Sequence, residues 1–328
     1  MELFYPIELS LTHFLQNLGD WLQPIMHFFT FFGNEEFYLL VMPILYWCVD
    51  TVLGLRIGIM LVLSGTLNGI LKLIFKFPRP YWIDKTVTAY ISESSFGMPS
   101  GHAMNAMSVW GLFAASVHKK AIKTASVVLI VLVGISRIYL GVHFSSDVLV
   151  GWLLGGLLLT LYLHNEKRIT AWIKELPLWH LVFLLFFISI ALIGLGALSL
   201  SIPGGWEIPQ TWIETAAVTD PSGELDPLSL EGTISNAAIF FGLTSGAAFF
   251  HSKGGFNHQG TWQQHILKFL IGVCGVVILW MGLGQVFPHS ADLFGFTLRY
   301  LRYALTGFWI AAGAPAIFIK LGLSQKGE

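Results

Sequence analysis

Residues 121–164 read AIKTASVVLIVLVGISRIYLGVHFSSDVLVGWLLGGLLLTLYLH. Two apolar runs, each of about 20 residues and so long enough to cross a bilayer as a helix, flank a short polar turn. Arg137, His143 and Asp147 lie at this turn. A charged side chain at the bilayer centre costs about 2.5–3.5 kcal/mol on insertion scales, so such groups usually face a polar cavity and serve a function. The stretch predicts a helical membrane protein with a polar site at one end of its helices.

The composition of the whole chain agrees with this fold class. Of its 328 residues, 55% are hydrophobic and only 11% are charged, and the mean hydropathy is +0.69. We therefore predict an all-α fold, a polytopic transmembrane helical bundle, in place of a soluble domain. The nine segments that we expect to span the membrane are approximately 36–52, 55–76, 102–118, 121–140, 146–164, 178–202, 233–251, 265–287 and 296–320.

Three parts of the chain differ in pattern. Residues 1–35 alternate apolar and polar positions at helical spacing, which predicts an extracytoplasmic helix lying in the membrane interface or a peripheral packing helix. Residues 36–165 hold the polar fragments and form the expected catalytic membrane core. Residues 166–328 add further transmembrane helices and an acidic outer loop, 203–232, with six acidic residues, no basic ones and four prolines. We expect this loop to be a semi-ordered outer cap.

The distribution of lysine and arginine predicts the orientation of the chain. Eleven of them fall on one side of the nine predicted spans and seven on the other. Since cytoplasmic loops carry the excess of basic residues, the first side, with the C-terminus, is predicted to be cytoplasmic. The polar fragments then lie on the extracytoplasmic side. The chain contains no N-x-[ST] sequon, which fits a bacterial inner membrane with a periplasmic site.

The first polar fragment is Lys72–Pro80, KLIFKFPRP. Lys72, Lys76 and Arg79 follow one another at i, i+4 and i+7, which would place all three on one face of a helix. The two prolines of the fragment would end that helix and leave Arg79 at its outer mouth. Alternatively, the lysines are interfacial cations that extend toward the lipid headgroups, and this reading suits Lys76 best.

The second fragment, Pro99–His102 (PSGH), directly precedes an apolar run and so lies where a helix begins. Ser100 is a plausible N-cap, and the amides of the first turn can receive an anion. Gly101 would let that anion approach the backbone closely. Taken alone, the tetrapeptide could also be only a turn and a cap.

The third fragment, Ser136–Asp147 (SRIYLGVHFSSD), places Asp147 four residues after His143. A carboxylate that accepts one imidazole N–H fixes the tautomer and leaves the other nitrogen to react, although such a pair could also be structural. Arg137 ends the preceding apolar run. Together the three fragments bring three cations, an amide-rich helix start and two histidines, which predicts a phosphate site.

These fragments, read as Lys72-x6-Arg79-Pro80, PSGH and Ser136-Arg137-x5-His143-x3-Asp147, resemble the three signature motifs of the type 2 phosphatidic acid phosphatase (PAP2) superfamily over about residues 35–160. Within that superfamily, FPRPYW and SRIYLGVHF are similar to glucose-6-phosphatase. In contrast, GNEEFYLLVMPILYW and GMPSGHAM are similar to the sphingoid-base-phosphate phosphatases. The two likenesses imply different substrates.

The resemblance implies a role for each motif residue. His143 would be the nucleophile that forms a phosphohistidine, and Asp147 would orient it. His102 would be the general acid that protonates the leaving oxygen and later the base that activates water. The residues that would hold the phosphoryl oxygens are Lys72, Arg79, Ser100, Gly101 and Arg137.

We therefore expect an integral-membrane, metal-independent phosphatase that removes phosphate from a lipid monoester or pyrophosphate. It needs no cofactor and no metal, since three cations already neutralise the transferring group. Its expected partners are a phosphorylated lipid and the membrane lipids, with no nucleic acid, and the sequence does not predict an oligomeric state. The alternatives are a sugar-phosphate phosphatase of the glucose-6-phosphatase type, a membrane transporter or channel, and a non-catalytic lipid-binding protein.

Two weaker candidates lie elsewhere. Arg299 and Arg302, near the outer end of the last predicted span, could contact a phosphate or a lipid headgroup, but extension toward the interface is the simpler interpretation. Glu35 and Glu36 open the first predicted span, where acids commonly stabilise a helix N-terminus.

Overall fold

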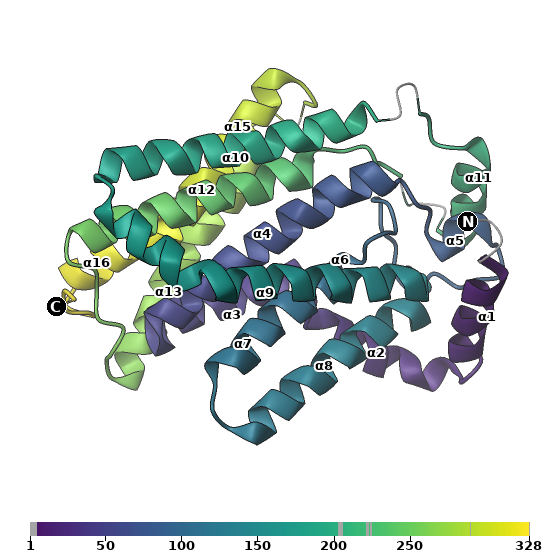
Figure 1. The fold of residues 1–328 in the computed structure, drawn as a ribbon, viewed down its shortest axis with the longest axis horizontal. Helices are drawn as coiled ribbons and strands as arrows, with labels where there is room; N and C mark the ends of the chain where they lie inside the picture. The colour runs from purple at the N-terminus through teal and green to yellow at the C-terminus, as the bar shows by residue number, and fades with distance from the viewer. Residues whose placement is uncertain (1–4, 203–205, 221–222, 224, 289, 328) are drawn as a thin grey trace. The chain divides into compact units, whose positions relative to one another are not determined.

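The structure, a computed structural model, describes residues 5–202, 206–220, 223, 225–288 and 290–327. These residues form helices and their connections, with no strand beyond an isolated bridge between Phe256 and Lys326 (Figure 1). The predicted all-α fold is confirmed. Because every backbone N–H and C=O must be paired inside a bilayer, helices are the natural way for such an apolar chain to cross it.

Sixteen α-helices are found in the described residues, joined in places by single π-helical segments. Their bounds are α1 Tyr5–Gln16, α2 Gln23–Phe31, α3 Glu35–Ile44, α4 Thr51–Phe75, α5 Pro80–Ile83, α6 Gly101–Asn105, α7 Gly111–Ser116, α8 Lys120–Tyr139, α9 Ser145–Glu175, α10 Leu178–Leu200, α11 Gln210–Thr219, α12 Glu231–Ser252, α13 Trp262–Val277, α14 Leu283–Val286, α15 Leu293–Phe308 and α16 Ala314–Lys320. The π-helical segments are Leu45–Val49, Ala106–Trp110, Ile278–Gly282 and Trp309–Gly313.

Seven helical stretches among the described residues are long and apolar enough to cross a membrane. They are Thr51–Ile83, Lys120–Tyr139, Ser145–Glu175, Leu178–Leu200, Glu231–Ser252, Trp262–Val286 and Leu293–Lys320. Each overlaps one of the nine predicted segments. The other two predictions, 36–52 and 102–118, fall on shorter helical stretches, so the count of nine stays a prediction.

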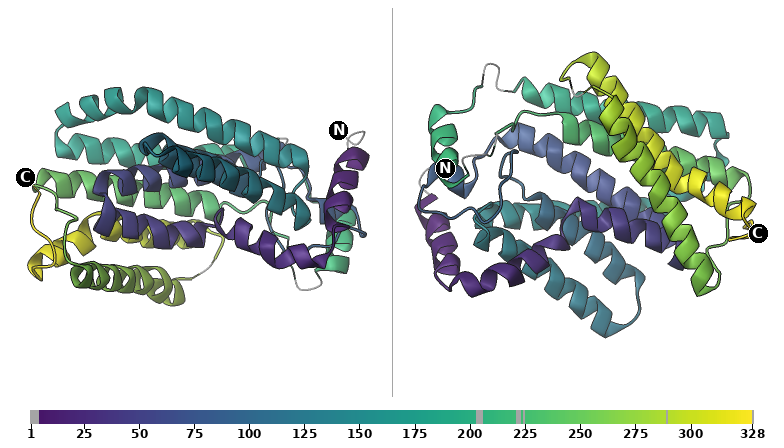
Figure 2. Two further views of the ribbon diagram at one scale, coloured as in Figure 1. Left: turned by 90° about the horizontal axis from the view of Figure 1, so that it is seen from below. Right: turned by 180° about the vertical axis from the view of Figure 1, so that it is seen from behind.

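The chain divides into two compact units, and the division cuts α3, α4, α9 and α10. Unit 1 comprises Met1–Phe37, Leu67–Leu161 and Gly196–Ser229, and unit 2 the rest. In unit 1, α2 packs along α8, and α11 packs on α5 (Figures 1 and 2). The three-part division by sequence pattern stays a prediction.

The N-terminal region is two helices and not one. The helical pattern of residues 1–35 is interrupted after Gln16, and Gly19 there has a φ of 110°, a conformation that side chains with a Cβ rarely adopt. A 3₁₀ turn, Asp20–Leu22, then leads into α2. The chain therefore changes direction between α1 and α2.

The end of α4 also differs from the sequence prediction. The helix stops at Phe75, and Lys76 takes a left-handed conformation with a φ of 52°. Arg79 lies beyond the helix as the extended residue before α5. The expectation that Lys72, Lys76 and Arg79 share one helix face is therefore wrong. The left-handed residue and the following proline-rich segment turn the chain before Arg79 is reached.

The acidic loop 203–232 contains a helix of its own, α11. Trp212 on this helix lies with its ring centroid 6.0 Å from that of Trp82 in α5, and Trp206 lies 5.4 Å from Phe96 by the same measure. Aromatic pairs at these separations are attractive. The described part of the loop thus packs on the segment that joins the first two motifs.

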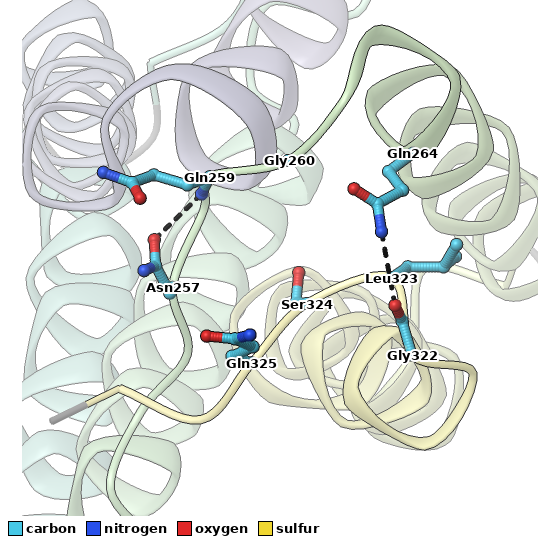
Figure 3. Close-up of a pocket in the computed structure, with 8 residues that line it drawn as sticks. All are labelled: Asn257, Gln259, Gly260, Gln264, Gly322, Leu323, Ser324 and Gln325. Atoms are coloured by element: carbon cyan, nitrogen blue, oxygen red, sulfur yellow. Dashed lines mark hydrogen bonds between the residues drawn. The ribbon is translucent and has the colours of Figure 1, made fainter.

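Unit 2 is held together by close contact between α12 and α15, which run side by side in Figure 1. A Cβ at Gly242 would lie 1.9 Å from the Ala304 carbonyl oxygen, so only glycine permits this approach. The unit also has a polar pocket of about 240 Å³ lined by residues between 257 and 264 and between 322 and 325 (Figure 3). No motif residue lines this pocket.

Candidate active site

All eight motif residues proposed for the site belong to unit 1. The last turn of α4 carries Lys72, and α5 is preceded by Arg79. Arg137 lies in the last turn of α8, and Asp147 in the first turn of α9. The segment that opens α6 provides the remaining motif, PSGH, with Ser100 at the N-cap. The ends of five helices thus contribute to one site.

Arg79 lies at the centre of this arrangement and is fully buried. Its Nε donates to the Ser95 carbonyl oxygen over 2.6 Å, and its Nη1 donates to the Val142 carbonyl oxygen over 2.9 Å. Its Nη2 contacts the Ser95 hydroxyl at 3.1 Å and the Phe96 carbonyl oxygen at 3.2 Å. The guanidinium is therefore fixed by backbone carbonyls from two loops, and its plane cannot easily rotate.

The same guanidinium defines the tautomer of His143. Arg79 Nη1 lies 3.3 Å from His143 Nε2. Since arginine only donates hydrogen bonds, Nε2 must be the acceptor and must lack a proton. The proton then resides on Nδ1, which lies 3.3 Å from Asp147 Oδ2. A neutral imidazole with a lone pair on Nε2 is the form required of a nucleophile.

Asp147 is held in place as firmly as the histidine. Its Oδ2 also accepts the Phe144 N–H over 2.9 Å, and its side chain is only 1% exposed. Its backbone carbonyl accepts the Ser100 N–H over 3.0 Å, which ties the second motif to the third. His143 precedes α9 and Asp147 lies within it, so the contact is made across the start of the helix.

The PSGH segment caps its helix as predicted. The Ser100 hydroxyl accepts the Ala103 N–H over 3.4 Å, which confirms the N-cap. Its own N–H is used by Asp147, so the amides without helical partners begin at Gly101. A Cβ at Gly101 would lie 3.0 Å from Asn68 Oδ1, and Asn68 in turn donates to the Pro99 carbonyl oxygen over 3.0 Å. Glycine thus also allows α4 and α6 to approach.

His102 and Arg137 are both contacted from the N-terminal region. His102 Nε2 lies 2.7 Å from Asn34 Oδ1, and Arg137 Nη1 donates to the Thr30 hydroxyl over 2.8 Å. Arg137 is 1% exposed, and its Nε has no hydrogen-bond partner among the described residues. An unpaired buried donor costs about 1–3 kcal/mol, so this atom points to a ligand that accepts hydrogen bonds.

The two lysines of the first motif have different partners. Lys72 Nζ donates to the Ser95 hydroxyl over 2.8 Å, next to Arg79, and so belongs to the cluster. Lys76 Nζ instead donates to the Ile202 carbonyl oxygen over 2.6 Å and lies 5.6 Å from the Trp206 ring centroid. Lys76 is 6% exposed, so it binds the C-terminal end of α10 and is not a cation extended toward the membrane surface.

Sequence reasoning missed Glu93 as a member of this cluster. Glu93 forms an ion pair with Arg137, and its Oε2 lies 3.7 Å from Arg79 Nη2. It lies in a polar loop, where a lone acid looks like an ordinary solvated residue. The sequence predicts three cations in one buried site, and a carboxylate is a common partner for buried cations. That excess of positive charge was the only signal that could have suggested an acidic residue in the site.

Burial and the charges of the two arginines keep His143 neutral and Glu93 ionised. Burial lowers the pKa of His143 well below 6.5, and the positive charges of Arg79 and Arg137 lower it further. Burial by itself raises the pKa of Glu93, but the Arg79 and Arg137 charges outweigh this and hold that pKa well below its ordinary value. Both shifts follow from an excess of cations in a poorly solvated place.

The weaker sequence candidates Arg299 and Arg302 belong to unit 2, whereas the motif residues belong to unit 1. Arg299 forms an ion pair with Glu231, and its Nη1 lies 3.4 Å from the Ser235 hydroxyl. Arg302 is 8% exposed and lies 4.8 Å from the Tyr303 ring centroid. Both pack inside unit 2, so neither is a cation that extends into solvent. The side chains of Glu35 and Glu36 lie outside the described residues.

Comparison with known proteins places this arrangement in a class. The family model "PAP2 superfamily" matches residues 53–171, and "PAP2 superfamily phosphatase, transmembrane extension" matches residues 234–326. Phosphatidylglycerophosphatase B of Bacillus subtilis is 38% identical over 165 residues, which are 45% of this chain and 77% of that protein. Buried cations around a neutral histidine, in a helical membrane protein related to these families, define a membrane phosphatase.

Two further proteins are similar to parts of this chain. Human sphingosine-1-phosphate phosphatase 2 is 34% identical over 137 residues, covering 39% of this chain but only about a third, 34%, of that protein. The crystal structure of a transmembrane PAP2 type phosphatidylglycerolphosphate phosphatase from Bacillus subtilis shares 31% identity with a TM-score of 0.41, covering 51% of this chain and 94% of that one. The chain belongs to the PAP2 superfamily, and the resemblance seen in the motifs is confirmed.

Proposed function

We propose that this protein hydrolyses a lipid phosphate through a phosphohistidine formed on His143. The observation that carries the proposal is the row Arg79–His143–Asp147, with both contacts to the imidazole at 3.3 Å. It presents an unprotonated Nε2 beside a fixed guanidinium, with a carboxylate behind it to stabilise positive charge on the ring. Phosphoryl transfer needs this kind of positioning and charge stabilisation more than any other contribution.

In the first step, the His143 Nε2 lone pair attacks phosphorus and the bond from phosphorus to the lipid oxygen breaks. His102 gives its proton to the leaving oxygen, so the lipid departs as an alcohol or, from a pyrophosphate, as a monophosphate. The Nδ1 proton of His143 stays directed at Asp147. Lys72, Arg79 and Arg137 stabilise the charge on the phosphoryl oxygens, with the amides that begin at Gly101, just after the Ser100 cap.

In the second step, His102 acts as a base and takes a proton from water. The water oxygen attacks phosphorus, the bond from phosphorus to Nε2 breaks, and inorganic phosphate leaves. His143 is restored with its lone pair on Nε2, and His102 is again protonated. The cycle balances without a metal or another cofactor, because the cations carry out the charge stabilisation that a metal would otherwise provide.

The substrate class is inferred from the relatives and the setting. The names of the matched proteins include phosphatidylglycerophosphatase, sphingosine-1-phosphate phosphatase and undecaprenyl-diphosphatase, whose substrates are all lipids with a phosphate. The cluster lies at the ends of apolar helices, where a headgroup could bind while its chain stays in the membrane. These two arguments favour a lipid over a soluble sugar phosphate.

Initial rates of phosphate release by the purified protein test this proposal. The substrates are phosphatidic acid, a sphingoid-base phosphate, a polyisoprenyl diphosphate and glucose 6-phosphate. We expect at least one lipid to react much faster than glucose 6-phosphate, His143→Ala to abolish release while the protein stays folded, and His251→Ala, a matched change at an exposed histidine, to have no effect. Faster release from glucose 6-phosphate, or full activity of His143→Ala, contradicts the proposal.

We further propose that the site faces the extracytoplasmic side and that the C-terminus is cytoplasmic. The excess of lysine and arginine in the opposite connections supports this orientation. A bacterial inner membrane would then expose the site to the periplasm. A reporter fused to the C-terminus that is active only in the cytoplasm tests the orientation, and an inactive reporter on a folded, phosphate-releasing protein contradicts it.

A further inference from the structure

The backbone of Glu93 is anchored by a tyrosine. The Tyr81 hydroxyl accepts the Glu93 N–H over 3.1 Å and donates to the Glu93 carbonyl oxygen over 2.9 Å. Tyr81 belongs to α5 and is 1% exposed, so this clamp is rigid. Glu93 is consequently held at a fixed place on the wall of the site, and its side chain can move only by rotation about its own bonds.

The Glu93 carboxylate lies on the two arginines of the site. One oxygen pairs with Arg137 Nη2, and the other lies 3.7 Å from Arg79 Nη2. These two arginines are among the residues that the proposed function assigns to the phosphoryl oxygens. An internal anion therefore takes the position that the substrate's anion needs.

We propose that Glu93 is a displaceable internal ligand of the phosphate site, which binds Arg79 and Arg137 until a phosphoryl group replaces it. The proposal rests on the proposed function and deepens it, because it names a residue that sets which anions can enter. A ligand must compete with a carboxylate that is always present. A dianionic phosphate group with three oxygens can do so, whereas a singly charged carboxylate or sulfonate competes poorly.

The contacts of the two arginines favour replacement of the Glu93 carboxylate by a phosphoryl group over simultaneous binding of both anions. Arg79 already directs its five N–H groups at Ser95, Phe96, Val142 and His143, so it offers an additional anion its charge but no free donor. Two anions on the same nitrogens would also repel each other strongly in a poorly solvated place. A phosphoryl group that is to reach Arg79 and Arg137 must therefore take the position of the carboxylate.

Arg137 shows why the exchange can favour phosphate. Its Nη2 contacts Glu93, but its Nε has no partner among the described residues. Phosphate oxygens can engage Nε and Nη2 of one arginine together, in the two-pronged geometry that guanidinium favours. Replacement of the carboxylate would pair a buried donor that Glu93 leaves unpaired.

The structure also provides a place for the displaced side chain. Glu93 is 27% exposed and lines a cavity of about 250 Å³ together with Tyr81, Ser92, Ser94 and Asp220. Rotation into this cavity would bring the carboxylate to the serine hydroxyls and to solvent while the Tyr81 clamp stays intact. The cost of leaving the arginines is thus partly offset by hydration and by hydrogen bonds.

Equilibrium binding of inorganic phosphate to the purified full chain tests the proposal, measured by calorimetry and as the Ki for competitive inhibition of turnover. Glu93→Gln keeps the side-chain shape and removes the charge. A hydrogen bond to a charged group contributes enough that we expect phosphate to bind about tenfold to a hundredfold more tightly. Glu214→Gln removes the same charge from an exposed position of α11 and serves as the matched control, with an unchanged Ki.

Weaker or unchanged phosphate binding by Glu93→Gln overturns the proposal, because it means that Glu93 only holds the arginines in position. If Glu93→Gln fails to fold, Glu93→Asp provides the test. It draws the carboxylate back from the arginines, so tighter phosphate binding is again expected, and failure of both variants to fold also overturns the proposal. Wild-type protein that releases phosphate from no lipid refutes the proposed function instead, whatever the Glu93 variants show.

Discussion

Replacing Asp147 by asparagine tests how much the negative charge beside the His143 ring contributes to the proposed mechanism. In the structure two donors converge on the same carboxylate oxygen, His143 Nδ1 at 3.3 Å and the Phe144 N–H at 2.9 Å. An asparagine therefore has to turn its oxygen, and not its NH₂ group, toward this point. The imidazole keeps its proton on Nδ1, and Nε2 remains able to attack. What disappears is the negative charge behind a ring that becomes positive during the reaction.

The size of the effect follows from that geometry. A hydrogen bond to a charged group contributes about 1.5–3 kcal/mol net, and a neutral one about 0.5–1.5 kcal/mol. Losing the charge therefore costs about 1–2 kcal/mol in the resting enzyme, and more once the ring is phosphorylated. At about 1.4 kcal/mol for each factor of ten, kcat should fall about tenfold to a hundredfold. A switch to the wrong tautomer would cost far more, of the order of 10⁴-fold in the best-studied histidine–aspartate pair, that of the serine proteases.

Single-turnover release of phosphate from the best lipid substrate measures this loss, with a melting curve to show that the variant is folded. Asp226→Asn, which removes a charge from an exposed position of the loop 203–232, is the matched control and should retain full activity. Wild-type rates for Asp147→Asn would refute the argument that the charge stabilises the phosphorylated ring. A loss of 10⁴-fold or more would refute the argument that Phe144 dictates the amide orientation.

Three further predictions concern groups around the site. Asn34→Ala removes the acceptor 2.7 Å from His102 Nε2, and kcat should fall about tenfold, since a neutral hydrogen bond contributes about 1 kcal/mol. The pH profile should shift as well, and Asn34→Asp should partly restore it. An unchanged profile would exclude a positioning role for Asn34. Lys76→Met removes the 2.6 Å hydrogen bond to the Ile202 carbonyl oxygen and should lower the melting temperature while kcat stays at the wild-type level. A proportional loss of turnover would contradict a purely structural role for Lys76. Because burial and the neighbouring guanidiniums lower the pKa of His143, the acid-side decline of kcat/KM should begin only well below pH 6.5. The contribution of this neutral histidine to folding stability is full above pH 6.5 and is lost as the pH falls further. An acid limb above pH 6.5 would contradict the shift.

Much of the fold and part of the site follow from sequence alone. The apolar runs predict the helices because a bilayer leaves the backbone few other options. Ser100 before an apolar run predicts the cap, and the spacing of His143 and Asp147 predicts their contact. These inferences succeed because each depends on residues within about one helical turn of one another.

The remaining features depend on groups far apart in the chain. Lys76 fits a helical spacing, but its left-handed conformation carries it to the end of α10, and no local pattern encodes that destination. Glu93 and Asn34 look like ordinary polar loop residues until folding brings them to Arg137 and His102. Residues with one polar group and a distant partner give no periodic signal, so sequence patterns cannot find them.

Several contacts to the site come from outside the catalytic family match, which begins at residue 53. Thr30 bonds Arg137, Asn34 bonds His102, and Glu8 accepts the Ser145 hydroxyl over 2.7 Å where α9 begins. Chimeras that exchange the first 34 residues between superfamily members would therefore alter how the acid and one cation are supported, with every signature motif left intact. Substitutions in these N-terminal residues could therefore change the catalytic rate, although a comparison of the motifs alone would not single them out.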